Sequence, residues 1–184
     1  LKMKHLLLKD HFMLNVISSL AIVDFIKKKS VANVKVKWPN DIYLDGIKMG
    51  GILIENNFQA GKWSFSIIGI GLNINQTQFE NMRGHSLRSY LDLKQAISLP
   101  EIYDYISQGV EESYTLFTGE QFEKIDEIYH ERLFRRLQWA PYEALNEKFT
   151  GKILGVNEQG LLEIEKEFTV ESYDLKEISF IFPS

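Results

Sequence analysis

The spacing of apolar residues along the chain predicts α-helices near its beginning and in its middle, with β-strands between them. Residues 6–28 repeat apolar side chains at the spacing of one helix face, which predicts a long helix. Residues 34–38 alternate with the two-residue period of a strand, and residues 63–75 form a further apolar strand. After these strands we expect a short helix near 86–91 and two amphipathic helices over 99–117 and 120–138.

A hairpin is predicted between the two strand segments, because Asp45-Gly46 favours a two-residue type I′ turn. One face of this hairpin is apolar and is expected to pack on the core, since side chains alternate along a strand. The other face brings Lys48 within reach of Asp41 as a diagonal neighbour. The expected cross-strand partners are Asp41 with Gly50, Ile42 with Met49, Tyr43 with Lys48, and Leu44 with Ile47.

Two interpretations of this hairpin remain open from the residues alone. In the first, Lys48 and Asp41 form an exposed ion pair worth about 0–1 kcal/mol, and Gly50-Gly51 mark a β-bulge. In the second, the two glycines leave the backbone bare so that a ligand can approach it closely. Gly69 and the glycine two residues later repeat the pattern in the next strand, which favours the second interpretation.

The sequence pattern changes near residue 147, from helical segments to short strands that are separated by glycines. We therefore expect a main domain over 1–146 and a small β module over 147–184. Because so short a segment rarely folds alone, the module should pack on the main domain.

Composition excludes several classes of function. The net charge of −4 over 184 residues does not favour a nucleic-acid-binding protein. No cysteine is present, which excludes disulfides and thiolate metal sites, and the histidines show no metal-binding spacing. No apolar run approaches the roughly 18 residues of a membrane-spanning helix. The chain begins with Leu, so we expect it to be a fragment of a longer protein.

Three motifs together identify a family. KWPNDI at 37–42, KMGGILIE at 48–55 and GIGLNIN at 69–75 occur in the order and spacing of the biotin protein ligases, which the chain resembles over nearly its whole length. The resemblance implies an α+β fold. It implies a mixed sheet with helices, like that of class II aminoacyl-tRNA synthetases and lipoate ligases, and a C-terminal SH3-like β module.

The resemblance also implies an activity and a set of site residues. Biotin and ATP with Mg²⁺ would give biotinyl-5′-AMP and pyrophosphate, and the biotinyl group would pass to one lysine of a biotin carboxyl carrier domain. The family's essential lysine falls on Lys48, and Asp41 would position the acceptor lysine or accept its proton. The further expected contacts are Gly50, Gly51, Leu53 and Gly69 with biotin, Asn73 and Asn40 with the adenylate, and Lys48 with both.

Composition and the resemblance together set further expectations outside the site. No metal is expected to be bound by protein ligands alone. The protein should be cytoplasmic, with no nucleic-acid or membrane partner, and could form a homodimer. The family's Ser-Thr-Asn segment and its Gly/Arg-rich adenylate loop lie upstream of the first long helix, so this chain would carry only part of the site. The alternatives are a related lipoate-type acyl-protein ligase and a catalytically incomplete binding module.

Overall fold

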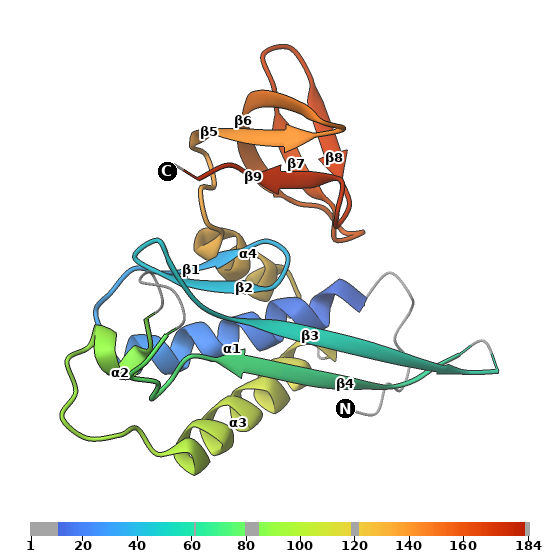
Figure 1. Cartoon of the computed structure of the whole chain (residues 1–184). Coiled ribbons are helices and arrows are strands. Elements are labelled where there is room, and N and C mark those ends of the chain that lie inside the picture. The colour runs from blue at the N-terminus through green and yellow to red at the C-terminus, as the bar shows by residue number, and fades with distance from the viewer. Residues whose placement is uncertain (1–10, 61, 80–84, 119–121, 183–184) are drawn as a thin grey trace.

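The computed structural model describes residues 11–60, 62–79, 85–118 and 122–182, and Figure 1 shows them arranged around two β-sheets. The sheet with the longest strands, called the larger sheet here, contains β1 (Val34–Lys37), β2 (Asp41–Leu44), β3 (Ile47–Gln59) and β4 (Lys62–Leu72) in that order. Among the described residues, the strand pairs of this sheet are all antiparallel, whereas we expected a mixed sheet. The expected α+β class is confirmed.

Helices cover one face of the larger sheet. Helix α1 (Met13–Lys29) is buried on nearly all sides rather than along one stripe, and its lysine-rich C-terminal end is exposed. Helix α3 (Leu99–Thr118) packs along α1 and begins where Ser98 Oγ accepts a hydrogen bond from the Glu101 N–H. The short helix α2 (Leu87–Tyr90) lies where the sequence predicts one.

Helix α4 (Phe122–Arg132) is shorter than the sequence pattern predicts. The chain leaves the helix because the next residues bond to the sheet instead, and Phe134 donates its N–H to the Val36 carbonyl at 2.8 Å. Arg135 and Leu137 then adopt positive φ angles of 60° and 57°. A helical pattern alone does not reveal this change, since the competing bonds come from a distant strand.

The second sheet forms the C-terminal module, drawn in orange and red in Figure 1. It contains β5 (Trp139–Ala144), β6 (Glu147–Val156), β7 (Leu162–Glu165), β8 (Val170–Tyr173) and β9 (Ile178–Phe180), in the order β8-β7-β6-β5-β9. Its first strand, β5, therefore lies before residue 147, where we expected the module to begin. The turn that joins β5 to β6 is Leu145-Asn146, with positive φ at both residues, and a leucine gives no turn signal.

The β2–β3 hairpin has the predicted turn but a shifted register. Asp45 and Gly46 have φ angles of 46° and 82°, as a type I′ turn requires. Leu44 pairs with Ile47 and Tyr43 with Lys48 as expected, but Ile42 pairs with Gly50 and Asp41 with Gly51. Our prediction that Ile42 pairs with Met49 and Asp41 with Gly50 is therefore wrong. Met49 is the extra residue of a β-bulge, and its side chain is buried in the core.

The two sheets contact each other through the β1–β2 hairpin. The Trp38 indole Nε1–H, which is buried, donates a hydrogen bond of 3.0 Å to the Gly160 carbonyl. The Tyr43 ring stacks on Phe134 and Phe182, with centroid distances of 5.1 and 6.0 Å. The sequence places Tyr43 on the same face as Lys48, but the ring is buried beneath the end of the chain. Among the described helices, none is long and apolar enough to cross a membrane.

Candidate functional site

Three charged side chains meet at one end of the larger sheet. Lys48 Nζ lies 2.6 Å from Asp41 Oδ1, so the predicted proximity of these two residues is confirmed. Lys37 Nζ lies 3.6 Å from Asp41 Oδ2. The Lys48 side chain is 52% exposed, whereas Asp41 and Lys37 are each 18% exposed. One carboxylate thus lies between a buried ammonium and an accessible one.

The electrostatics of this cluster favour an anionic ligand. Burial lowers the pKa of Lys37, and the nearby Lys48 ammonium lowers it further, while the Asp41 carboxylate opposes both effects. A cluster with two amines and one carboxylate keeps a net positive charge when all three groups are ionised. The accessible amine, Lys48, is the one that an incoming anion can reach.

A strip of bare backbone begins beside this cluster. Gly51 of β3 lies directly opposite Gly71 of β4, and Gly69 lies opposite Leu53. Residues directly opposite each other in an antiparallel sheet share one face. Gly51, Gly69 and Gly71 therefore form a continuous floor without side chains, called the glycine strip here. A Cβ atom built on Gly51 would lie 3.1 Å from Asp41 Oδ1, which puts the carboxylate on the same face.

The far end of the strip is apolar. Leu53 is 65% exposed and Ile67, two residues before Gly69 in β4, is 57% exposed. The opposite face of the sheet carries the buried Ile52, whose partner Ile70 lines a groove shared with α3. The strip therefore lies on the face away from α3. This face offers a cation at one end, a flat floor and an apolar wall, which suits an elongated carboxylic acid.

Gly50 has a different structural role from Gly51. A Cβ atom on Gly50 would lie 2.1 Å from the Gly71 carbonyl oxygen and 2.7 Å from Leu72 Cδ2. Real Cβ atoms do not approach backbone so closely, so a side chain here would push β4 away. The bulge interpretation thus accounts for Gly50, while Gly51 and Gly69 leave the floor open.

The asparagines predicted to bind the adenylate already have partners in the protein. Asn40 Nδ2 donates to the Ile52 carbonyl at 2.6 Å, which ties the loop before β2 to β3. Asn73 Oδ1 accepts a longer bond of 3.3 Å from Gln76 Nε2 and remains half-buried near the surface. Their proposed ligand contacts stay predictions. Of the two, Asn73 is the less firmly engaged.

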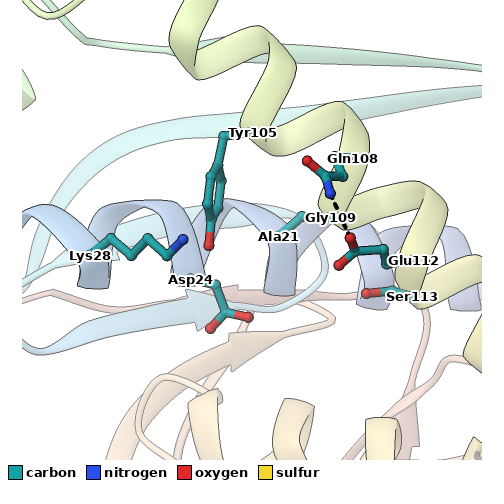
Figure 2. Close-up of a pocket in the computed structure, with 8 residues that line it drawn as sticks. All are labelled: Ala21, Asp24, Lys28, Tyr105, Gln108, Gly109, Glu112 and Ser113. Atoms are coloured by element: carbon teal, nitrogen blue, oxygen red, sulfur yellow. Dashed lines mark hydrogen bonds between the residues drawn. The ribbon is translucent and has the colours of Figure 1, made fainter.

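Two further hollows border α3. A groove of about 480 Å³ lies between β4 and α3 and is lined mainly by apolar side chains such as Leu72 and Ile102. A more polar hollow of about 370 Å³ lies between α1 and α3. Figure 2 shows Asp24 and Lys28 of α1 on one side of it, with Tyr105, Gln108 and Glu112 of α3 on the other. Lys28 Nζ lies 4.3 Å from the Tyr105 ring centroid, and neither hollow is lined by Lys48 or Asp41.

Within the described part of the chain, no group of three or more His, Asp or Glu side chains could hold a metal ion. Ile67, which extends the apolar end of the strip, is not among the residues that the sequence motifs predict. Its alternation with Gly69 and Gly71 along one strand is the signal that could have identified it. Lys37 Nζ also lies 4.6 Å from the ring centroid of Phe180 in β9, and no sequence pattern indicates this contact.

Comparisons with known proteins agree with the resemblance expected from the three motifs. Residues 2–73 match the model of the Biotin/lipoate A/B protein ligase family. Biotin–protein ligase 2 of Arabidopsis thaliana is 31% identical over 112 residues, which cover 60% of this chain and 34% of the plant protein. The bifunctional ligase/repressor BirA of Bacillus spizizenii is 28% identical over 168 residues, which cover 84% of this chain and 48% of the relative. The chain thus spans between a third and a half of the length of these curated relatives.

Solved structures show the same fold. A biotin protein ligase from Aquifex aeolicus superposes with a TM-score of 0.75 at 20% identity, covering 95% of this chain and 76% of that one. The same Aquifex protein in complex with biotin and ATP gives a TM-score of 0.73 at 20% identity, covering 92% and 71%. The C-terminal β module and the α+β architecture of the rest of the chain therefore occur together in a known fold.

Proposed function

We propose, from the premise that this chain is similar to the biotin protein ligases in sequence and in fold, that it carries part of an ATP-dependent biotin–protein ligase. The observation that carries the proposal is the glycine strip with Lys48 at one end and Leu53 at the other. The biotin carboxylate would lie at Lys48, and its apolar body would lie along the strip toward Leu53. Biotin, ATP and a carrier-domain lysine are the proposed substrates.

In the first step a biotin carboxylate oxygen attacks the α-phosphorus of ATP and pyrophosphate leaves, which gives biotinyl-5′-AMP. Negative charge gathers on the phosphoryl oxygens during this attack. The Lys48 ammonium is held in place by Asp41 at 2.6 Å, so it can stabilise that charge without first being ordered. Asn73 and Asn40 would contact the adenylate.

In the second step the amine of the carrier lysine attacks the acyl carbon, the bond to AMP breaks, and the amine loses a proton. Asp41 is the carboxylate nearest to Lys48 and would orient the incoming amine or accept that proton. Its Oδ2 contacts Lys37 at 3.6 Å, so the carboxylate is fixed from a second side. A fixed base in a defined position is what general base catalysis requires.

ATP enters this proposal as its Mg²⁺ complex. Mg²⁺ binds phosphates together with one or two carboxylates and keeps several waters. The Asp41 carboxylate is already engaged by two lysines, which makes the nucleotide's own phosphates the better ligands. Because ATP is supplied inside the cell, the proposal includes a cytoplasmic location.

The decisive experiment uses the full-length gene product and measures biotin-dependent exchange of pyrophosphate into ATP, followed by biotin transfer to a purified carrier domain. A biotin ligase should catalyse both reactions with biotin and neither with lipoate. Exchange with lipoate alone would favour the lipoate-type ligase that the family model also includes. Biotin binding by calorimetry without any exchange would favour a binding module and would contradict the enzyme assignment.

Homodimer formation is a separate part of the proposal. β4 is the last strand in the order β1-β2-β3-β4, and its outer edge pairs with no other described strand. An open edge of this length is a template for pairing with a second chain. Light scattering after gel filtration should then give twice the chain mass of 21.4 kDa, and a monomeric mass would remove this part.

A further inference from the structure

We propose that the C-terminal module is part of the candidate site, because the ring of Phe180 in β9 holds the Lys37 ammonium against Asp41. Phe180 is thus a positioning residue, which acts on the ion pair of Lys48 and Asp41 through Lys37. The catalytic consequences rest on the proposed function, but the contact itself does not.

The contact joins the two sheets at a single amine. Lys37 Nζ lies 4.6 Å from the centroid of the Phe180 ring and 3.6 Å from Asp41 Oδ2. An ammonium at this distance from a ring centroid is attracted by the negative potential of the ring face, and more strongly where water is excluded. The Lys37 side chain is largely buried, so the ring replaces part of its lost hydration.

Lys37 needs that partner because burial and two nearby cations disfavour its charge. Burial lowers its pKa first, and the positive charges of Lys48 and Arg135 also lower it. Asp41 is the charged neighbour that raises the pKa, and it is shared with Lys48. The Phe180 ring supplies a second attraction that no other cation shares in the described contacts.

The ring is held in position from its own sheet. Phe180 packs edge-on against the buried Tyr142 ring at 5.2 Å between centroids. Beside it, Arg135 Nη1 donates to the Ile181 carbonyl at 3.0 Å, and the Arg135 guanidinium lies 4.7 Å from the Phe182 ring. The end of the chain is therefore fastened to the segment between α4 and β5. Phe180 cannot move without disturbing these contacts.

The consequence for the site is geometric. Lys37 engages Asp41 Oδ2, which leaves Oδ1 directed at Lys48. If Lys37 were neutral or displaced, the carboxylate would be free to turn, and Lys48 would lose its fixed partner. A residue near the end of the chain thus determines where the cation of the first sheet is held.

The test replaces Phe180 with leucine and compares it with the same change at Phe149. Phe149 belongs to the same module, and its ring lies 4.2 Å from a different ammonium, Lys166 Nζ, which pairs with Glu171 instead of Asp41. NMR titration of ¹³C-labelled lysines reports the Lys37 pKa without any need for activity. Phe180→Leu should lower that pKa, Phe180→Tyr should restore it, and Phe149→Leu should leave it unchanged.

In the pyrophosphate exchange assay, Phe180→Leu should reduce kcat on the order of twofold to tenfold, the size of one cation–π contact. The alkaline limb of its pH profile should move to lower pH, with a smaller change in the KM for biotin. An unchanged Lys37 pKa in folded Phe180→Leu overturns the inference. If the wild-type protein shows no exchange, the proposed function fails while the titration still decides the role of Phe180.

A readout in the wild-type protein covers the case in which the leucine variant does not fold. Protons on the Lys37 ε-carbon that lie over the Phe180 ring face should resonate upfield of those of exposed lysines. Absence of this ring-current shift overturns the inference without any variant.

Discussion

At the scale of single residues, the site depends on how one carboxylate is shared. Asp41 pairs with Lys48 at 2.6 Å and with Lys37 at 3.6 Å. Removal of either amine therefore leaves the carboxylate with a partner, so no buried charge is left alone. Function and stability can thus be separated at this position, which is rarely so for a buried charge pair.

Lys48→Ala should reduce adenylate formation by about 10²–10³-fold, as is typical when one group that stabilises transition-state charge is removed. Its unfolding temperature should change little, because the side chain is half-exposed and such pairs contribute little. Pyrophosphate exchange and thermal unfolding measure the two effects. Lys62→Ala, at the exposed start of β4, is the matched control. A large loss of stability in Lys48→Ala would instead make Lys48 a structural residue.

The two adjacent glycines should respond differently to alanine. Gly50→Ala should destabilise the fold by about 1–3 kcal/mol, since its Cβ would lie 2.1 Å from the Gly71 carbonyl oxygen. Gly51→Ala should cost less stability, because its nearest neighbour is the Asp41 carboxylate at 3.1 Å. It should weaken biotin binding instead. Urea unfolding and calorimetry distinguish the two variants, and equal destabilisation would contradict the distinction between bulge and floor.

At the scale of elements, the loop between β1 and β2 joins the two sheets. The buried Trp38 donates its indole N–H across this junction to the Gly160 carbonyl. Gly160 has a φ of +84°, and a Cβ atom there would lie 2.7 Å from Phe12. Trp38 therefore packs at the junction of the two sheets and holds it with a buried hydrogen bond.

Trp38→Phe should lower the free energy of unfolding by about 1–3 kcal/mol, because the Gly160 carbonyl loses its partner in a buried place. For a chain of this size that is roughly 2–4 °C of unfolding temperature for each kcal/mol. Trp139→Phe removes an indole that is half-exposed and should change little. Differential scanning calorimetry on both variants checks this, and similar shifts for the two would contradict the role of the Trp38 bond.

At the scale of the whole molecule, His130 of α4 forms a second connection to the module. Its Nδ1 lies 2.8 Å from the Asp126 carbonyl, and its Nε2 accepts the Val156 N–H at 2.9 Å. The Val156 carbonyl lies 3.2 Å from the same Nε2 and can accept a hydrogen bond from it when the ring is charged. The imidazole thus keeps a partner on β6 in both protonation states.

The hydrogen bond that the His130 ring donates to the Asp126 carboxylate raises the pKa of His130 above its usual 6.5, although burial opposes the change. A raised pKa means that the folded protein favours the charged ring. The resulting stability should be fully present below about pH 6.5 and should be lost as the pH rises through the higher folded value. Urea unfolding between pH 5.5 and pH 8.5 measures the slope. Asp126→Asn should flatten it, and an unchanged slope would exclude His130 as its source.

Much of the fold follows from the local sequence pattern, and two predictions that were wrong share one cause. The type I′ turn at Asp45-Gly46 and the start of α3 at Ser98 are set by neighbouring residues, so the sequence reveals them. The bulge at Met49 is not set by neighbouring residues, because it depends on how closely β4 approaches Gly50. The early end of α4 likewise depends on bonds to β1.

The same division applies to the site. The proximity of Lys48 and Asp41 follows from strand pairing, and the proposed biotin contacts of Gly51 and Leu53 follow from the family motifs. Asn40 is different, because its amide is occupied by the Ile52 carbonyl and only the folded chain reveals that bond. The contact of Phe180 with Lys37 joins residues far apart in sequence, where pattern analysis has no information.

The unequal exposure of the two lysines around Asp41 has a consequence for ionic strength. At physiological salt the Debye length is about 8 Å, so mobile ions weaken the pull of an exposed charge far more than that of an enclosed one. Added salt should therefore slow the capture of a charged acid by Lys48 while leaving the inner contact of Lys37 almost untouched. Ionic strength would then change the rate at which the ligand binds, while the contact between Lys37 and Asp41 keeps its geometry.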